Sequence, residues 1–330
     1  MLRFLVGKMR RKGVIALQLN WIFVLIIGAI ILTFFIVIVQ KQREVSEQTI
    51  SGAIQTDLQA IFASSAVSTG TASIVEVPSR EISFSCEGFK VGNQFAANFP
   101  YAFAPDLIKS DRNTISIYAY DWSIPMRITN LLYVTSPDVR YILVGTGDTM
   151  THLEEIMPPR YIEKDGQSKL FMDWMPYNSL SSVPPDNGAN YKVKFVFVES
   201  LPGTSTVSGF EKADWSALLV NNDQTLKLYT KPSRNSVALT EFVESDYDSD
   251  AMLLAAIFAE NNNTYECGRD NANDRLEFVK YVYKNRTQKL NDDLSSCNYD
   301  SALIDLDSLP SLDLENENNQ LLENSCPAVY

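Results

Sequence analysis

The longest apolar run of the chain lies near its N-terminus. Residues 21–39 read WIFVLIIGAIILTFFIVIV and are interrupted only by Gly28 and Thr33. About 20 helical residues cross the roughly 30 Å hydrocarbon core of a bilayer. A buried core helix is rarely so long and so uniformly apolar. The pattern therefore predicts a transmembrane helix over residues 14–40, with Trp21 at the level of the lipid headgroups.

Basic residues around this run predict its orientation. Residues 1–43 contain no acid and seven bases, which are Arg3, Lys8, Arg10, Arg11, Lys12, Lys41 and Arg43. Because five of them precede the run, the positive-inside rule makes residues 1–13 a cytoplasmic basic segment and places residues 44–330 outside. A cleaved secretory signal would have a shorter apolar region that ends in small residues. Since Gln40-Lys41 follows directly, a retained anchor is favoured.

The apolar pattern changes after the predicted membrane helix. Between residues 41 and 65, apolar side chains recur at helical spacing at Ile50, Ile54, Leu58, Ile61 and Phe62. This stripe predicts a juxtamembrane amphipathic helix that packs on its own domain or on a second copy. A stretch rich in Ser, Thr and Gly follows and indicates a linker.

Strand-like runs recur through residues 66–247. They are residues 72–77, 82–86, 114–120, 139–144 and 193–198, and the pair 216–220 and 225–230 flanks a turn-forming Asn-Asn-Asp. Helix-compatible segments lie between them at residues 126–134, 150–156 and 208–214. Residues 157–190 contain five prolines and are expected to form an irregular insertion. The alternation predicts an α/β ectodomain with a mixed sheet covered on both faces.

The last part of the chain, residues 248–330, has a helical pattern. Helices are expected over residues 250–260, 274–290 and 311–324. Asp248 or Ser249 could cap the first of these helices, and Asn271 or Asn273 the second. The predicted fold class is therefore α/β, with an N-terminal transmembrane helix, an extracytoplasmic mixed-sheet domain and a helical C-terminal part.

The charge of the chain argues against nucleic acid as a partner. The formal net charge is −12, from 28 Lys and Arg against 40 Asp and Glu. Without the seven bases of the N-terminal segment, the rest has 21 bases against the same 40 acids, a net charge of −19. A nucleic-acid-binding protein normally shows a basic surface instead.

Four cysteines lie outside the predicted membrane helix, at Cys86, Cys267, Cys297 and Cys326. Without a CxxC spacing they are poor zinc ligands, and on the oxidising side of a membrane they predict disulfides. Four cysteines allow three connectivities. We expect Cys267 to pair with Cys297 across the second C-terminal helix, which leaves Cys86 to pair with Cys326. The rival arrangement pairs Cys297 with Cys326 and Cys86 with Cys267.

The predicted location of residues 44–330 outside the cell makes N-linked glycosylation relevant. Two acceptor motifs for it begin at Asn262 and Asn285.

Catalytic motifs are not apparent. The one histidine, His152, accompanies no GxSxG sequence and no cysteine nucleophile signature, so we expect it to be solvated or packed. Gly145-Thr146-Gly147-Asp148 follows a predicted strand like a dinucleotide loop, but Met150 takes the place of the third glycine and no Walker lysine is present. We therefore predict a tight turn, no catalytic residue and no cofactor.

Three alternating acids, Asp246, Asp248 and Asp250, resemble the opening of a calcium loop. Ala251 and Ile257 break that pattern where glycine and a bidentate glutamate are required. We predict no metal site, and we expect these acids to cap the helix that follows.

The segment RRKG-VIALQ, residues 10–18, resembles the class III signal of type IV pilin-like proteins, particularly archaeal ones. In that family a peptidase cuts after the glycine, here Gly13, and the helix becomes a filament core. The fifth residue after the cut is usually Glu, whereas here it is Gln18. Residues 18–21, 255–260 and 325–327 are similar to uncharacterised single-pass membrane proteins of small-genome archaea, which implies a location but no activity.

These observations predict a non-catalytic, membrane-anchored protein of the cell envelope or surface that acts in binding or assembly. Its partners would be the lipid bilayer and another envelope or surface protein. Two alternatives stay open: a pilin-like subunit, and an ectoenzyme that uses carboxylates around the loop at residues 145–155.

Overall fold

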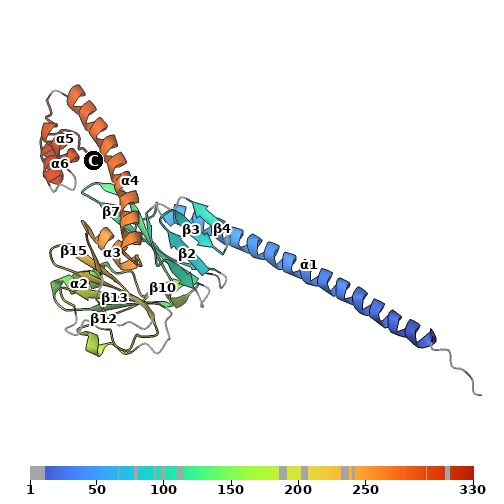
Figure 1. Ribbon diagram of the computed structural model, residues 1–330. Coiled ribbons are helices and arrows are strands. Elements are labelled where there is room, and N and C mark those ends of the chain that lie inside the picture. Colours follow the sequence, from blue (N-terminus) through green and yellow to red (C-terminus); the bar gives the residue numbers. More distant parts are fainter. Residues whose placement is uncertain are drawn as a thin grey trace, which may run out of the picture. The chain divides into compact units, whose positions relative to one another are not determined.

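The structure is a computed structural model that describes residues 12–65, 67–77, 81–92, 94–97, 101–109, 114–185, 192–201, 207–231, 238–239, 242–294, 296–308 and 313–330. The protein is mixed α/β, with a long N-terminal helix, several β-sheets and helices at the C-terminal end (Figure 1). It divides into two compact units, residues 1–53 and 54–330.

Helix α1 (Lys12–Ser65) contains both the apolar run and the amphipathic stripe. Every side chain from Trp21 to Val39 is exposed, and this is the one described helix long and apolar enough to cross a membrane. The Thr33 hydroxyl donates to the Ala29 carbonyl oxygen at 2.8 Å, so its polar group is satisfied within the helix, as a bilayer requires. Ile54, Leu58 and Phe62 belong to the second unit and are buried there.

Two four-stranded sheets pack with the end of α1 in the second unit. Sheet A has the order β1 (Ala72–Glu76), β7 (Thr114–Ser123), β8 (Arg127–Thr135), β5 (Ala102–Phe103). Sheet B has the order β4 (Gln94–Ala97), β3 (Gly88–Val91), β2 (Glu81–Ser85), β6 (Leu107–Lys109). Ile54, Leu58 and Phe62 form one apolar cluster with sheet B and one face of sheet A.

Sheet C has six strands. Their order is β12 (Asp173–Tyr177), β9 (Val139–Val144), β13 (Lys192–Val198), β14 (Asp214–Val220), β15 (Thr225–Thr230), β16 (Phe242–Asp246). The first four strands are parallel, and β15 is antiparallel to both of its neighbours, β14 and β16. The expected hairpin is thus confirmed as β14 and β15.

Helix α3 (Asp250–Phe258) lies between sheets A and C, and every residue after Asp250 is buried. The Phe258 ring is 5.1 Å from the Tyr133 ring of sheet A and 5.3 Å from the Tyr141 ring of sheet C, measured between centroids. Helix α2 (Asp148–Ile156) contributes to the same apolar cluster. The opposite face of sheet C is covered by irregular segments that contribute Val183, Val207 and Phe210.

Three of the expected local structures are wrong. Residues 126–134 form strand β8 instead of a helix, because sheet A is covered on both faces and its strand therefore lacks polar alternation. Residues 208–214 form turns that lead into β14. The region 157–190 is not wholly irregular, since it contains the hairpin of β10 (Tyr161–Lys164) and β11 (Gln167–Leu170), strand β12 and the short helix η1 (Leu180–Ser182).

The C-terminal helices are α4 (Asn262–Asp293), α5 (Asp300–Asp307) and α6 (Asp313–Glu323). Ser249 caps α3 as expected, whereas Asn261, and neither Asn271 nor Asn273, caps α4 by accepting from the Thr264 amide at 3.1 Å. Gly268 lies inside α4, where a Cβ would be 2.4 Å from the Phe103 ring. This glycine permits close packing and does not form a turn.

The expected pairing of Cys267 with Cys297 is wrong. The structure pairs Cys86 with Cys267 and Cys297 with Cys326, with Cα atoms 5.6 and 5.9 Å apart. The reason is that α4 continues without a break from Asn262 to Asp293. Because each helical residue adds 1.5 Å, Cys267 lies about 39 Å from Asp293, the last residue of α4.

Two lysines of β13 hold the carboxyl end of α3. The Lys194 Nζ donates to the Ala259 carbonyl oxygen at 2.7 Å, and Lys192 forms an ion pair with Glu260. Positive groups are favourable at this end of a helix because the last carbonyl groups are unpaired. Burial lowers the pKa of Lys194 to about 8, against the attraction of Glu260.

We expect peptide mapping without reductant to recover the linked peptides Cys86–Cys267 and Cys297–Cys326. Replacing both Cys297 and Cys326 by alanine should lower the free energy of unfolding by about 3–4 kcal/mol, because the bridge closes a loop between residues 29 apart. Urea denaturation of the full chain in detergent measures this loss. Recovery of a Cys267–Cys297 peptide would contradict the observed connectivity.

The lowered pKa of Lys194 predicts a dependence of stability on pH. Between about pH 8 and the ordinary pKa of 10.5, the unfolded chain keeps the proton that the folded chain has released, so Lys194 should contribute a rise in stability with pH across this window. Buried tyrosines such as Tyr133 and Tyr265 have raised pKa values and contribute a fall near pH 10 and above, equally in wild type and variants. The rise should be absent in Lys194→Met and present in Lys212→Met, in which an exposed lysine is replaced. Identical pH profiles for wild type and Lys194→Met, measured by urea denaturation, would refute this.

Candidate functional site

The parallel strands of sheet C create a crevice at their carboxyl ends. The chain leaves β9 towards β12 on one side, and it leaves β13 towards β14 on the other. Where neighbouring parallel strands diverge in this way, α/β sheets commonly bind ligands. A cavity of about 790 Å³ lies at this point, which is within the usual size range of small-molecule sites.

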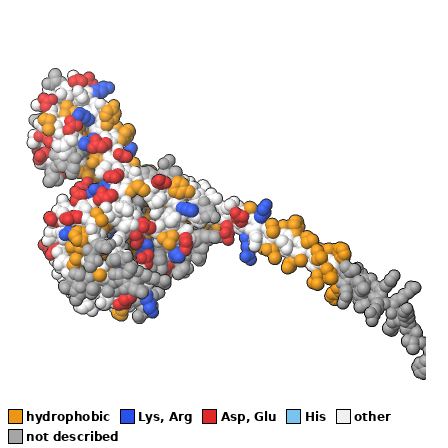
Figure 2. All heavy atoms as spheres, in the orientation of Figure 1, with side chains coloured by type: hydrophobic (Ala, Val, Ile, Leu, Met, Phe, Trp, Pro, Cys, Tyr) orange, Lys and Arg blue, Asp and Glu red, His pale blue; other side chains and the backbone are white. Residues whose placement is uncertain are grey.

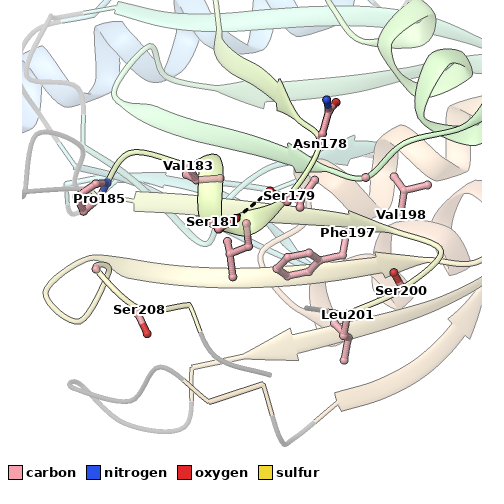
Figure 3. A pocket seen from close by; sticks show the side chains of 14 residues that line it. Asn178, Ser179, Ser181, Val183, Pro185, Phe197, Val198, Ser200, Leu201 and Ser208 are labelled. Carbon is pink, nitrogen blue, oxygen red and sulfur yellow. Dashed lines mark hydrogen bonds between the residues drawn. The ribbon is translucent and has the colours of Figure 1, made fainter. Parts of the chain in front are cut away.

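The cavity has an apolar floor and a polar rim. Val144, Phe197 and Val198 come from the ends of the two strands, and Leu180, Val183 and Leu201 come from the covering segments. The rim carries the side chains of Asn178, Ser179, Ser181, Ser200 and Ser208 (Figure 3). The hydroxyls of Ser179 and Ser181 are 3.0 Å apart and hydrogen-bonded. Every described residue that lines the cavity is uncharged.

Glycines allow the backbone segments around the cavity to approach each other. At Gly145, a Cβ would lie 2.8 Å from the Cβ of Val198, and φ is +158°. At Gly209, a Cβ would lie 2.9 Å from the Cβ of Pro185, and φ is +91°. The close approach of β9 and β13 thus explains Gly145 without a nucleotide, and the absence of dinucleotide binding stays a prediction.

The carboxylates of the loop at residues 145–155 do not line the cavity. Asp148, Glu154 and Glu155 are exposed, and Glu199 accepts a hydrogen bond from the Thr149 hydroxyl at 3.3 Å. The His152 Nε2 is 2.7 Å from the Asp250 Oδ1 at a half-exposed position. Glu199 and His152 thus connect α2 to a loop of sheet C and to α3.

The three alternating acids each have a partner within the protein. Asp246 pairs with Arg269 at 2.5 Å, Asp248 accepts from the Ser249 hydroxyl at 2.8 Å, and Asp250 contacts His152. Among the described residues, no group of three His, Cys, Asp or Glu side chains is placed to hold a metal ion.

The remaining predicted positions lie on helices. Gly13 is in the first turn of α1, and nothing in the structure tests cleavage after it. Asn262 is the first residue of α4 and its Oδ1 is buried, whereas Asn285 is exposed in the same helix.

The sequence pointed to one part of the cavity, the glycine loop after β9. It did not point to the polar rim. Asn178, Ser179 and Ser181 lie in the proline-rich segment that was expected to be irregular, and Ser208 lies in a segment that was expected to be helical. The tertiary structure brings these segments to the strand ends.

Comparison with known proteins finds no matching family model, no matching curated protein and no matching solved structure.

Proposed function

We propose that the chain is a non-catalytic, membrane-anchored protein of the cell envelope or surface, and that its ectodomain binds a small uncharged ligand. The cavity at the carboxyl ends of β9 and β13 is the observation that carries this proposal. Its apolar floor and its few hydroxyl and amide groups are the usual composition of a small-molecule site. Because its described lining is uncharged, a charged ligand would lose its hydration without gaining an ion pair.

Two observations support the proposed location of residues 44–330 outside the cell. The basic segment precedes the apolar part of α1, which fits a cytoplasmic N-terminus. All four cysteines are in disulfides, which form and persist mainly in oxidising compartments.

The second candidate function is a pilin-like subunit. Helix α1 is uninterrupted over 54 residues, and its apolar side chains from Trp21 to Val39 are exposed on all sides. Such a segment suits a filament core as well as a bilayer, and it follows the signal-like sequence that ends at Gly13. The ectoenzyme alternative gains no such support, because the described lining of the cavity contains no carboxylate.

The location and the two candidates are separated by one experiment on intact cells. Added protease should digest residues 44–330 and leave a protected N-terminal fragment that still begins at residue 1, as determined by mass spectrometry. A fragment that begins at Val14, together with filaments in electron micrographs, would select the pilin-like subunit. Protection of residues 44–330 until the cells are lysed would refute the orientation.

The cavity is tested with neutral and charged probes. Maltotriose or a capped neutral tripeptide at millimolar concentration should raise the melting temperature of the purified protein, whereas ATP and NAD should not. Ser208→Trp places a large side chain at the rim and should abolish the shift, and Ser301→Trp, on the exposed face of α5, should leave it intact. A shift with neither neutral probe, or one that Ser208→Trp retains, would refute binding in this cavity.

A further inference from the structure

Helix α4 has an exposed apolar stripe on one face. Phe278, Tyr281 and Val282 are 55, 66 and 47% exposed and lie three and four residues apart, so they are neighbours on the helix surface. Figure 2 shows hydrophobic side chains along this helix. Arg275 lies over the Phe278 ring at 5.2 Å from its centroid. Leu276 and Val279 occupy the opposite face and are buried.

Asn285 continues this stripe. It lies three residues after Val282 and four after Tyr281, and its side chain is exposed. It also begins the triplet Asn285-Arg286-Thr287, which is an acceptor sequence for N-linked glycans. A group attached to its side-chain amide would therefore lie next to the exposed aromatic ring of Tyr281.

The fold gives no structural role to the hydroxyl group of Thr287. It is fully buried, and its hydroxyl has no hydrogen-bond partner. Helical threonines usually donate to the carbonyl oxygen four residues earlier, as Thr33 and Thr49 do in α1 at 2.8 and 2.9 Å. A buried hydroxyl without a partner destabilises a protein, so valine would fill this site better. The acceptor sequence, however, requires a hydroxyl at this position.

We propose that Asn285 carries an N-linked glycan that covers the exposed stripe of α4. The inference rests on the proposed location outside the cell, where a membrane transferase would supply a lipid-phosphate-linked oligosaccharide. The Asn285 Nδ2 bonds to C1 of the first sugar as the bond from C1 to the phosphate oxygen breaks. The lipid phosphate leaves with the electron pair, and the amide proton passes to a base of the transferase.

The chemistry of the stripe suits a sugar. The C–H groups on the faces of sugar rings carry partial positive charge and pack against the negative face of an aromatic ring. The glycan would shield Tyr281 and Val282 from water and keep its own hydroxyls solvated. It would thus reduce the exposed apolar area that otherwise favours aggregation.

The second acceptor sequence, at Asn262, has a structural explanation. The Thr264 hydroxyl donates to the Asp106 Oδ1 at 2.8 Å, and the Thr264 amide is capped by Asn261. The Asn262 Oδ1 is buried in the first turn of α4. Since the hydroxyl of this triplet stabilises the fold, its presence does not indicate modification, and we expect Asn262 to be unmodified.

Mass spectrometry of the full chain, purified from the membranes of the cells that make it, tests the proposal. The peptide with Asn285 should carry a sugar mass, and the peptide with Asn262 should not. Asn285→Gln and Thr287→Val should lose that mass completely, and Thr287→Ser should keep it. The unmodified Asn285→Gln protein should also bind more hydrophobic dye than the wild type.

Two further readouts make the outcome decisive. Unmodified Asn285 in protein with intact disulfides would overturn the glycan proposal alone. Unmodified Asn285 together with reduced cysteines would refute the proposed location outside the cell, and the glycan proposal would fail with it. In chain made without glycosylation, Thr287→Val should not lower the melting temperature; a clear decrease would show that the hydroxyl has a structural role and would remove the argument.

Discussion

The burial of helix α3 between sheets A and C is the interaction on which the second unit depends. Its residues Ala251–Phe258 are buried on all sides, so it has no polar face and must lie within the core. Alanines at three of these positions allow the two sheets to approach, and Phe258 contacts an aromatic ring of each. The Tyr133 hydroxyl donates to the Ala251 carbonyl oxygen at 2.6 Å and fixes the first turn against sheet A.

A buried helix needs partners for its terminal backbone groups, and β13 supplies them at one end. Lys194 reaches the Ala259 carbonyl oxygen, and Lys192 neutralises Glu260. Helix α3 and strand β13 are thus joined by polar contacts as well as by apolar packing. Because α2 and α3 occupy one face of sheet C, the other face is left to the irregular connections, and these connections form the walls of the cavity.

One disulfide attaches the C-terminal part to this core, and the other lies within that part. Cys86 and Cys267 join the turn after β2 to α4, close to the contact of Gly268 with Phe103. Cys297 and Cys326 close the segment that contains α5 and α6. The exposed stripe at Phe278, Tyr281 and Val282 lies on α4 between these two bridges in sequence.

Local periodicity by itself determined the apolar helix at residues 21–39, the strands β7, β9 and β13, the β14–β15 hairpin and helix α3, because each has a pattern complete within its own residues. Strand β8 and the start of α4 were decided only by tertiary contacts. Burial on both faces removes polar alternation from β8. The start of α4 has a polar sequence, and it is helical where Gly268 packs on Phe103. The cysteine pairing and the cavity were likewise decided in three dimensions, because their residues come from segments distant in sequence that meet only when the sheets assemble.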